Sequence, residues 1–380
     1  MKILLVGEYS RLHNSLQEGL RALGHQVILI STGDYFKKYP SDIIIQRSFD
    51  KGLARKLKIA IYVLFKFDIT SWHMTKQFFK TSEKLKGFDV VQLINESPFG
   101  ASVKDEIKMI SFLKQNNKKL FLLSCGTDYL SVKHQLSNAN PYSIVSHYKD
   151  GSIAKIAFKN ILKYTTPAFK KLHQYVFKNI DGVIASDYDY HMPLAGNSKY
   201  LGLIPNPINT SKLSVFELDT KGPIVIFMGI NRTNYHSKGI SYFEKAIAII
   251  QQKFPKQVHI EIVENLPYAQ YIEKYNNAHI ILDQVFAYDQ GYNALEAMAK
   301  AKVVFTGAES GFMEHYKLDS PVAINALPKV DSLVLALEDL IKNPKKIKEI
   351  GMAAQNFVTQ HHNYKKVAQL YLDTWKLSRL

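Results

Sequence analysis

The chain of 380 residues is long enough for two domains of roughly 150–200 residues each, and its 46% apolar content is typical of globular proteins. A single cysteine, Cys125, excludes an intramolecular disulfide and fits a reducing compartment. No apolar run approaches the roughly 20 residues that span a bilayer, and the start MKILLVGEYS has the pattern of a strand rather than of a signal peptide. We therefore expect a cytoplasmic protein.

The net charge of +16 belongs mainly to the first half of the chain, because residues 1–200 carry +13 and residues 201–380 carry +3. Two stretches there, Leu53–Phe67 and Lys155–Lys178, interleave cations with apolar residues at helical spacing. Such helices can lie on an anionic membrane surface, so a peripheral position on the inner face of the cell membrane is one expectation. The alternative is a helix packed on a sheet with solvated lysines. We expect no nucleic-acid partner, because no recognised nucleic-acid motif accompanies the charge.

Strands and helices are predicted to alternate along the first half of the chain. The expected strands there are Ile3–Val6, Val27–Ile30, Ile43–Ile45, Val90–Leu93, Leu120–Ser124 and Val183–Ala185. Between the first two, Asn14–Leu23 has the apolar spacing of a helix and ends at Gly24. This alternation predicts an α/β fold with parallel sheets.

A second series of strands is predicted after a connector. The connector, Ile204–Pro223, contains three prolines and no apolar periodicity, as is typical of an interdomain segment. The expected strands beyond it are Ile224–Phe227, Ile260–Val263, Ile280–Leu282, Val303–Phe305 and Val322–Ile324. Two amphipathic helices, Ser332–Lys342 and about Tyr364–Leu377, are expected after them.

The most specific pattern runs from Asp283 to Thr306, DQVFAYDQGYNALEAMAKAKVVFT. It predicts a loop with a glycine and then a helix that opens near Asn293. The free N–H groups at a helix start can hold a phosphate, and the carboxylate of Glu296, one turn further in, can accept hydrogen bonds from a ribose. This stretch resembles the signature of the retaining glycosyltransferases of family 4, EGFGxxxLEAMAxGxPVV. Tyr288 stands where that signature has its first glutamate.

The resemblance implies the GT-B architecture, in which two Rossmann-like domains with parallel sheets face each other across a cleft. It implies an acceptor-binding domain over residues 1–205, a donor-binding domain over residues 206–360, and a helix over residues 361–380 that crosses back to the first domain. The donor would be a UDP- or GDP-sugar, and the transfer would need no metal ion. The implied donor site includes Gly291, Tyr292, Asn293 and Glu296.

Two cations follow the first strand of the second series. The segment IVIFMGINRTNYHSKGISYFEKAI places Arg232 and Lys238 in the loop after a buried strand. Ligands of open α/β sheets bind beyond the carboxyl ends of the strands, and an arginine fork with a lysine charge suits a diphosphate. The family has an Arg and a Lys at this place. The resemblance therefore implies that Arg232 and Lys238 bind the donor diphosphate and stabilise the charge that develops on it.

A third motif, SCGTDY, follows the strand Leu120–Ser124. Relatives often have HGSD or HGTD here, and this chain has Cys125 in place of the His. Asp128 is a candidate for orienting the acceptor, binding the donor sugar or acting as a base. Its alternative is an Asx turn or a helix cap. The SDYDY run, Ser186–Tyr190, is interpreted as a surface loop and not as a metal site.

The remaining candidates follow the strands of the first half. No GxGxxG follows the first strand, so a dinucleotide site is not expected. The resemblance places Gly7 near the donor phosphates, and Ser10 and His13 are expected to face the cleft. Asn95 and Glu96 lie on the ligand edge, where contact with the acceptor is one interpretation and a proline turn the other.

The expected function is transfer of a sugar, with retention, from a nucleoside-diphosphate sugar to a lipid-linked or polysaccharide acceptor in cell-surface glycan biosynthesis. One alternative is a GT-B protein that binds a glycan or nucleotide without transfer. A sugar-nucleotide epimerase is a further alternative, which the residues Ala294–Ala299 favour less because they are transferase-like.

Overall fold

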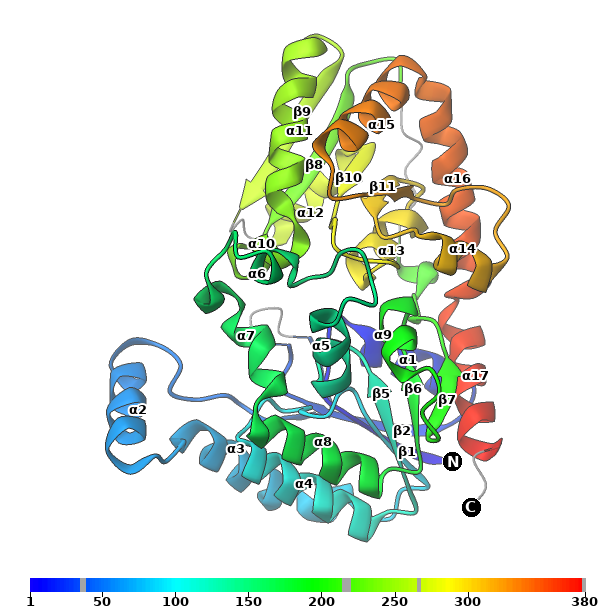
Figure 1. Ribbon diagram of the computed structural model, residues 1–380. Helices are drawn as coiled ribbons and strands as arrows, with labels where there is room; N and C mark the ends of the chain where they lie inside the picture. Colours follow the sequence, from blue (N-terminus) through cyan, green and yellow to red (C-terminus); the bar gives the residue numbers. More distant parts are fainter. Residues whose placement is uncertain (35–38, 214–219, 265–267, 378–380) are drawn as a thin grey trace.

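The computed structural model of the protein describes residues 1–34, 39–213, 220–264 and 268–377. Its strands form two parallel sheets that follow each other along the chain, which confirms the α/β fold class with two Rossmann-like domains (Figure 1). The first sheet, in the order β3-β2-β1-β4-β5-β6-β7, consists of β1 (Lys2–Val6), β2 (Gln26–Ser31), β3 (Ile43–Ile44), β4 (Val90–Leu93), β5 (Lys119–Ser124), β6 (Gly182–Ala185) and β7 (Tyr200–Leu203). The second, in the order β12-β11-β10-β8-β9, consists of β8 (Ile224–Ile230), β9 (Val258–Glu264), β10 (Ile280–Leu282), β11 (Val303–Thr306) and β12 (Ile324–Asn325).

The helices divide between the two sheets. Those before β8 are α1 (Leu12–Ala22), α2 (Gly52–Phe65), α3 (Ile69–Lys80), α4 (Val103–Asn116), α5 (Tyr129–Leu136), α6 (Ser146–Lys149), α7 (Lys159–Leu162), α8 (Pro167–Asn179) and α9 (Tyr188–Leu194). Those after it are α10 (Tyr235–Lys238), α11 (Ile240–Lys253), α12 (Tyr268–Asn277), α13 (Tyr292–Ala299), α14 (Ser310–Tyr316), α15 (Val330–Lys342), α16 (Pro344–His361) and α17 (Tyr364–Leu377).

Helices cover both faces of the first sheet, which is why its central strands are continuous apolar runs. Along β1, Ile3 and Leu5 belong to the core cluster shared with α1 and α17, whereas Leu4 and Val6 belong to the cluster shared with α3, α4 and α8. Strand β7 was not expected from the sequence. Its four residues are all half-buried, because it forms the edge of the sheet, and so they lack the apolar run of a central strand.

Helix α17 packs on the first sheet although it follows the second sheet in sequence (Figure 1). Its Trp375 is fully buried and donates a hydrogen bond from Nε1 to Oε1 of Gln92 on β4, at 2.9 Å. Helix α1 approaches it so closely that a Cβ on Gly19 would lie 2.3 Å from the carbonyl oxygen of Tyr364. The two chain crossings between the domains also pair with each other, through a parallel bridge between Ile208 and Asn363.

The segment between α5 and α7 leaves the first domain and packs on the second. Tyr142, in this segment, is buried in the core cluster that contains Ile226 and Phe243 of the second domain. Beside it, the ring of His147 on α6 stacks on Tyr242 of α11, with 5.8 Å between the ring centroids. The domains therefore contact each other through this excursion as well as through the two crossings.

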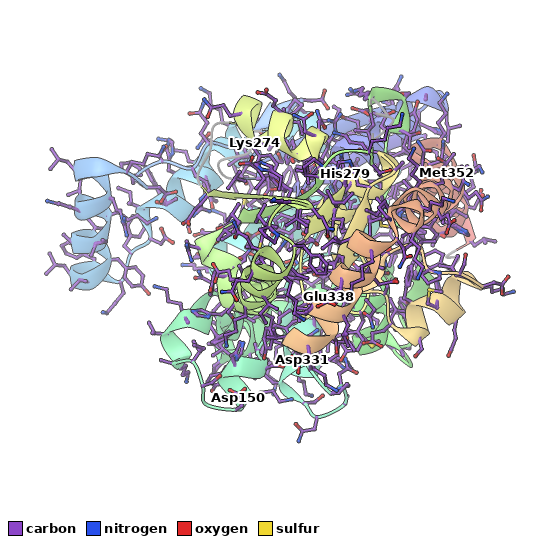
Figure 2. All side chains as sticks on the ribbon, turned by 90° about the horizontal axis from the view of Figure 1, so that it is seen from above. Asp150, Lys274, His279, Asp331, Glu338 and Met352 are labelled. Atoms are coloured by element: carbon purple, nitrogen blue, oxygen red, sulfur yellow. The ribbon has the colours of Figure 1, made fainter. Side chains whose placement is uncertain are left out.

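The two basic stretches have different environments. In Lys155–Lys178 the apolar side chains turn inward, since Phe158, Leu172 and Val176 are buried, and Ile156 is the large apolar residue there that stays exposed. In contrast, α2 has no buried residue at all and stands apart from the rest of the protein (Figures 1 and 2). The interpretation of a helix packed on a sheet is therefore wrong for α2.

Candidate functional site

A cavity of about 380 Å³ lies between the two domains, at the carboxyl ends of the strands. Its lining from the first domain includes Tyr9, Ser10 and Gly126, and its lining from the second includes Gly291 and Tyr292. The carboxyl edge of parallel strands is where ligands of α/β sheets bind. This cavity is therefore the candidate site.

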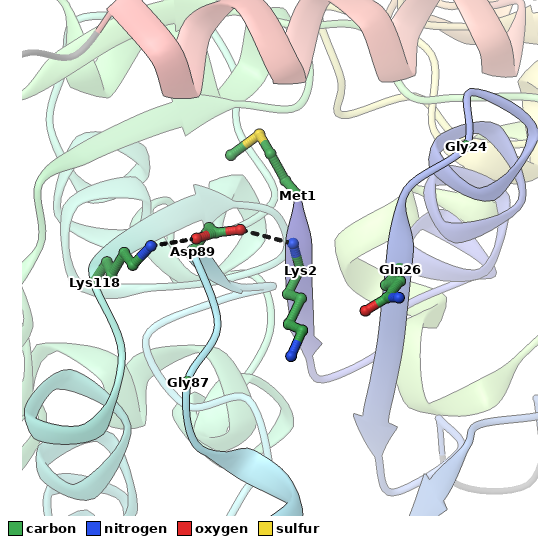
Figure 3. A pocket seen from close by; sticks show the side chains of 7 residues that line it. All are labelled: Met1, Lys2, Gly24, Gln26, Gly87, Asp89 and Lys118. Atoms are coloured by element: carbon green, nitrogen blue, oxygen red, sulfur yellow. Dashed lines mark hydrogen bonds and ion pairs between the residues drawn. The ribbon is translucent and has the colours of Figure 1, made fainter.

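A second cavity lies at the opposite edge of the first sheet (Figure 3). It lies where β1 and β4 begin, and Figure 3 shows Asp89 between the backbone N–H of Lys2 and the ammonium group of Lys118. The three groups satisfy each other at 2.8 and 2.7 Å. We therefore do not consider it a ligand site.

On the first domain, the turn after β1 forms one wall of the site. Gly7 has a φ of +87°, and a Cβ there would lie 2.3 Å from Cγ2 of Ile94, so the turn requires glycine. Ser10 and Arg11 follow with φ values of 50° and 73°, which are uncommon for residues with a side chain. The backbone N–H of Ser10 donates to Oδ2 of Asp34 at 2.9 Å. Strained backbone of this kind is concentrated at functional sites.

His13 does not face the cavity, contrary to the expectation from the sequence. Its ring is completely buried, and Nδ1 is 2.8 Å from the carbonyl oxygen of Gly7. Burial lowers the pKa of His13 to about 3, so the imidazole is neutral. Its role in this structure is to brace the turn after β1.

On the second domain, Lys238 points at an acidic partner between the strands. Its Nζ lies 2.8 Å from Oδ1 of Asp283, which is buried at the end of β10. The same oxygen accepts a hydrogen bond from Nδ2 of Asn293 at 3.3 Å. Lys238 and Asn293, which are far apart in sequence, are thus brought together as expected. Asp283 was missed, because the sequence shows only an acid after a short strand.

Helix α13 opens into this arrangement. Its N-cap is Gly291, and no side chain caps its first turn. A Cβ on Gly291 would meet nothing closer than Nε2 of Gln284 at 3.7 Å, so the glycine leaves room beside the helix start. The first N–H groups of a helix have no partner within it, which makes this end a possible anion site. Glu296 lies one turn further in and is half-buried.

Arg11 faces this helix from the other domain. Burial lowers the pKa of Arg11, but the nearby acidic groups outweigh burial and raise it overall. These groups are Glu18, Tyr292 and Glu296, of which the last two belong to α13. Next to them, the hydroxyl of Tyr292 lies 2.7 Å from that of Ser15 on α1. The start of α13 is therefore held against α1, with a cation and a carboxylate on opposite walls.

Arg232 is turned away from Lys238 toward the end of β9. Its guanidinium makes two hydrogen bonds to the carboxylate of Glu264, at 2.9 and 2.7 Å, and lies over the ring of Tyr235. More than half of its side chain is exposed. Arg232 and Lys238, which we expected to act together, therefore lie at the same sheet edge but have different acidic partners.

The structure favours the capping interpretation for Asp128. This residue is buried and caps α5, since Oδ1 accepts the N–H of Ser131 at 2.7 Å and Oδ2 accepts the hydroxyl of Ser124 at 2.8 Å. Both carboxylate oxygens are thus occupied by the protein. Cys125, which lines the cavity beside this loop, has its pKa raised by burial, which disfavours the reactive thiolate form.

Asn95 and Glu96 are buried beneath the cavity. Nδ2 of Asn95 donates to the carbonyl oxygen of Cys125 at 2.9 Å, which ties the loop after β4 to the loop after β5. Oε1 of Glu96 lies 2.6 Å from Nδ1 of His173 on α8, and burial followed by the charge of Asp128 raises the pKa of Glu96 well above its usual range. In this structure both residues support the loops instead of facing an acceptor.

The SDYDY run is not a surface loop. Asp187 caps α9, and the carboxylate of Asp189 accepts the backbone N–H groups of Tyr288 and Asp289 in the second domain. In return, Oδ2 of Asp289 accepts the N–H of Tyr188 at 2.8 Å. The run therefore belongs to the domain interface, which a local pattern of polar residues could not reveal.

Tyr288, at the place of the first glutamate of the signature, is also part of this interface. Its ring stacks on Tyr142 with 4.8 Å between the centroids, and its hydroxyl donates to the carbonyl oxygen of Tyr142 at 2.9 Å. The hydroxyl of Tyr142 in turn donates to Glu309. A neutral, buried side chain thus occupies a position where the signature has a charge.

Within residues 1–34, 39–213, 220–264 and 268–377, no group of three or more His, Cys, Asp or Glu side chains is placed to hold a metal ion. None of the helices in the described part of the chain has the length and apolar character needed to cross a membrane.

Similar solved structures define the fold as GT-B. Sucrose-phosphate synthase from Thermosynechococcus elongatus matches with a TM-score of 0.64 at 15% identity, over 99% of this chain and 98% of that protein. HepE from Anabaena, solved in complex with UDP and glucose, matches with a TM-score of 0.59 at 12% identity, over 99% of both chains. A putative UDP-N-acetylglucosamine 2-epimerase from Listeria monocytogenes matches with a TM-score of 0.54 at 11% identity, over 99% of this chain and 95% of that one.

A protein-family model matches the chain mainly over its second domain. Residues 233–373 match the model of a glycosyl transferase-like family. The matched region contains Lys238, Asp283 and Glu296, and also Gly291 and Tyr292, which line the cavity. No curated protein sequence matches the chain. The chain is thus a GT-B protein with a glycosyltransferase-like second domain.

Proposed function

We propose that the protein transfers a sugar from a nucleoside-diphosphate sugar, and that the donor lies between the turn after β1 and the start of α13. The observation that carries this proposal is that Lys238 and Asn293 both bond to Oδ1 of Asp283, beside an uncapped helix start. A buried carboxylate holds the ammonium group in one place before any ligand binds. A fixed cation and a helix N-terminus together suit a diphosphate.

The proposed chemistry is loss of the diphosphate from the anomeric carbon of the sugar. Negative charge builds on the leaving oxygen in the transition state, and a cation that is already oriented stabilises it without reorganisation. We assign this role to Lys238 and a weaker one to Arg232, because Arg232 has to leave Glu264 to reach the same phosphate. The carboxylate of Glu296 would accept hydrogen bonds from the ribose. No step requires a metal ion.

The finer points of the proposal rest on the family resemblance. They are retention of the anomeric configuration, membership of family 4, a hexose as the transferred sugar and UDP or GDP as the nucleotide. The proposed acceptor is lipid-linked or a polysaccharide, in the synthesis of a cell-surface glycan, and the proposed location is the cytoplasm. A retaining enzyme and an inverting one differ in the product anomer, which proton NMR of the product reads directly.

One polar group of the cavity, in the crossing from the first domain to the second, has no partner in the described part of the protein and is available to a ligand. The side chain of Asn206 lines the cavity and is buried, and its Oδ1 has no hydrogen-bond partner among the described residues. A buried amide oxygen without a partner costs about 1–3 kcal/mol, so a ligand hydroxyl or N–H that reaches it would be bound favourably. Asn206 therefore joins the proposed site, whereas Asp128 and His13 do not.

A second candidate function is nucleotide binding without transfer. The observation that favours it is Tyr288, which is buried against Tyr142 where the signature has a glutamate. A protein of this kind would bind the nucleoside diphosphate but release no sugar. The epimerase alternative differs again, because it would convert a UDP-sugar into its epimer without any acceptor.

The test combines binding with turnover. Calorimetry with UDP and GDP should show binding by the wild type, a large loss in Lys238→Ala and no change in Lys245→Ala, a control at an exposed lysine of α11. Incubation with a panel of UDP- and GDP-sugars then separates the candidates. Release of sugar or transfer to an acceptor supports the transferase, an epimeric product supports the epimerase, and binding without turnover supports the second candidate. Equal affinity in Lys238→Ala and wild type would refute the site.

A further inference from the structure

Helix α2 has an apolar surface that nothing in the described structure covers. None of its residues is buried, and it stands away from both sheets in two perpendicular views (Figures 1 and 2). Leu64 and Phe65 are 73% and 72% exposed. The other large apolar side chains of the helix that are exposed are Leu53, Leu57, Ile59, Tyr62 and Val63. Apolar patches of this size on a soluble protein mark an interaction surface.

The helix has little support from the rest of the protein. An isolated helix of this length is marginal in water, and most helices gain their stability from a packed apolar face. One contact that holds α2 is the ion pair of Lys58 with Asp50, at 2.7 Å, which is half-exposed. Such a pair contributes about 1 kcal/mol or less. A helix that keeps an apolar surface without packing it therefore calls for an external partner.

The positive charge of α2 and its flanking residues indicates which kind of partner would bind there. Residues 51–67 contain five cations and no acidic residue. These cations are Lys51, Arg55, Lys56, Lys58 and Lys66. Cations beside exposed apolar side chains complement a surface that is apolar inside and negatively charged outside, which is an anionic lipid bilayer. A second copy of α2 fits worse, because it would bring ten cations together.

The aromatic residues near the end of α2 match the same partner. Phe67, before α3, and Trp72, in the first turn of α3, are both exposed, and their rings lie 6.4 Å apart. Nζ of Lys76 lies 5.2 Å from the centre of the Trp72 ring. Aromatic rings with nearby lysines are the side chains that lie at the level of lipid headgroups.

We infer that α2 and the turn to Trp72 dock on an anionic bilayer, with the helix lying in the headgroup region and not crossing the membrane. Helix α2 leaves the first sheet after β3, at the edge where the loops of the cavity lie. The connecting loop is held there by Arg47, which donates to the carbonyl oxygen of Gly100 at 2.9 Å. Docking would therefore hold the cavity close to the bilayer surface. This inference concerns location and does not depend on the proposed reaction.

Vesicle flotation tests the inference. The wild type should float with vesicles of phosphatidylcholine and phosphatidylglycerol at about 0.1 M salt, stay behind with phosphatidylcholine alone, and be released at about 1 M salt. The triple variant Lys51→Ser, Arg55→Ser, Lys56→Ser should lower partitioning on the order of 100-fold, at roughly fivefold for each cation. The matched control Lys256→Ser, Lys345→Ser, Lys348→Ser changes the same charge on the second domain and should float like the wild type.

The apolar contribution needs its own variants. Leu64→Ser with Phe65→Ser should abolish flotation, whereas Leu335→Ser with Met352→Ser, at exposed apolar positions of the second domain, should not. Because no residue of α2 is buried, the first pair should leave the melting temperature unchanged. If the two pairs float equally well, α2 is not the contact.

Tryptophan fluorescence provides a readout at the surface itself. The chain has two tryptophans, the exposed Trp72 at the start of α3 and Trp375 in the core. Anionic vesicles should shift the emission to shorter wavelength in the wild type and not in Trp72→Phe. Light scattering in the absence of vesicles tests whether a second copy of the chain binds to α2 instead. A dimer that Leu64→Ser with Phe65→Ser dissociates would overturn the inference in favour of a second copy, as would the absence of any fluorescence shift.

Discussion

Asp189 and Asp289 hold the two domains together, because the carboxylate of each accepts a backbone N–H group from the other domain. Asp189, in the first domain, accepts the N–H of Asp289 at 3.1 Å, and Asp289 accepts the N–H of Tyr188, the neighbour of Asp189, at 2.8 Å. Asp289 is buried and Asp189 is partly buried, and burial raises the pKa of Asp189 to about 7 and of Asp289 to about 6. Asp289 lies two residues before Gly291, so the interface is continuous with the proposed phosphate site.

This pair predicts a dependence of stability on pH. A carboxyl whose pKa is raised by folding binds its proton more tightly in the folded state, so its contribution to the free energy of unfolding falls as the pH rises from about 4 through the raised pKa. Asp289→Asn removes the titration and keeps an oxygen acceptor. As the pH rises from about 5 to about 8, the free energy of unfolding of the variant should therefore increase by about 1–3 kcal/mol relative to that of the wild type.

Urea unfolding at the two pH values measures this difference. Asp319→Asn, at an exposed residue, is the control and should follow the wild type at both values. A difference between Asp289→Asn and the wild type that does not change with pH would show that the carboxyl stays ionised throughout.

Asp283→Asn should weaken binding of a nucleoside diphosphate. The Asn side chain keeps its contact with Asn293 but loses the charge that orients Lys238, so the ammonium group becomes mobile. We expect a smaller loss than in Lys238→Ala, on the order of tenfold in affinity, because the cation itself remains. Calorimetry measures both variants. An affinity as high as that of the wild type would mean that Asp283 does not position the lysine.

Glu296→Gln should cost roughly 1–3 kcal/mol of nucleotide binding, because a hydrogen bond from a ribose hydroxyl to a carboxylate becomes one to a neutral amide. The effect should disappear when the ribose lacks its 2′- and 3′-hydroxyls, since the partner of the carboxylate is then missing. Glu273→Gln, at an exposed position of α12, is the control. The same loss with both ligands would place Glu296 away from the ribose.

Gly7→Ala should destabilise the protein more than Gly151→Ala. Both residues have positive φ values, +87° and +75°, so both variants carry the strain of about 1 kcal/mol that this backbone imposes on alanine. At Gly151 nothing lies within 4 Å of an added Cβ, but at Gly7 it would meet Ile94 and Pro98. Overpacking adds about 1–3 kcal/mol there. Thermal unfolding compares the two, and equal losses would contradict the close packing of the turn.

The variant Asp128→Asn distinguishes between two roles of this residue, a structural helix cap and a catalytic base. Asn is as good an N-cap as Asp, so the variant should keep its stability within about 0.5 kcal/mol, whereas Asp128→Ala should lose about 1–2 kcal/mol. If Asp128 only supports the loop, the turnover of Asp128→Asn stays near that of the wild type. A loss of turnover on the order of 1,000-fold at unchanged stability would show instead that the carboxylate takes part in the chemistry.

The sheets could be predicted because their central strands are buried on both faces and leave continuous apolar runs in the sequence. The same reasoning placed Lys238 and the start of α13 at one edge, since parallel strands bring their carboxyl ends together. It failed for Asp189, whose partners are backbone groups that no side-chain pattern records, whereas for Asp128 the helix cap was one of the two interpretations that the sequence left open. It failed for α2 because a basic amphipathic helix has the same pattern whether it packs on a sheet or points into solvent.

The burial of Trp375 has a consequence for how the chain is made. Helix α17 completes the core cluster that contains Ile3 and Leu5. The first domain, although it is synthesised first, therefore cannot finish this core until residues beyond the whole second sheet have been translated. Until then, the face of the first sheet around Gln92 stays open. A nascent chain halted after β7 should therefore remain sensitive to protease, and adding α17 as a separate peptide should protect it.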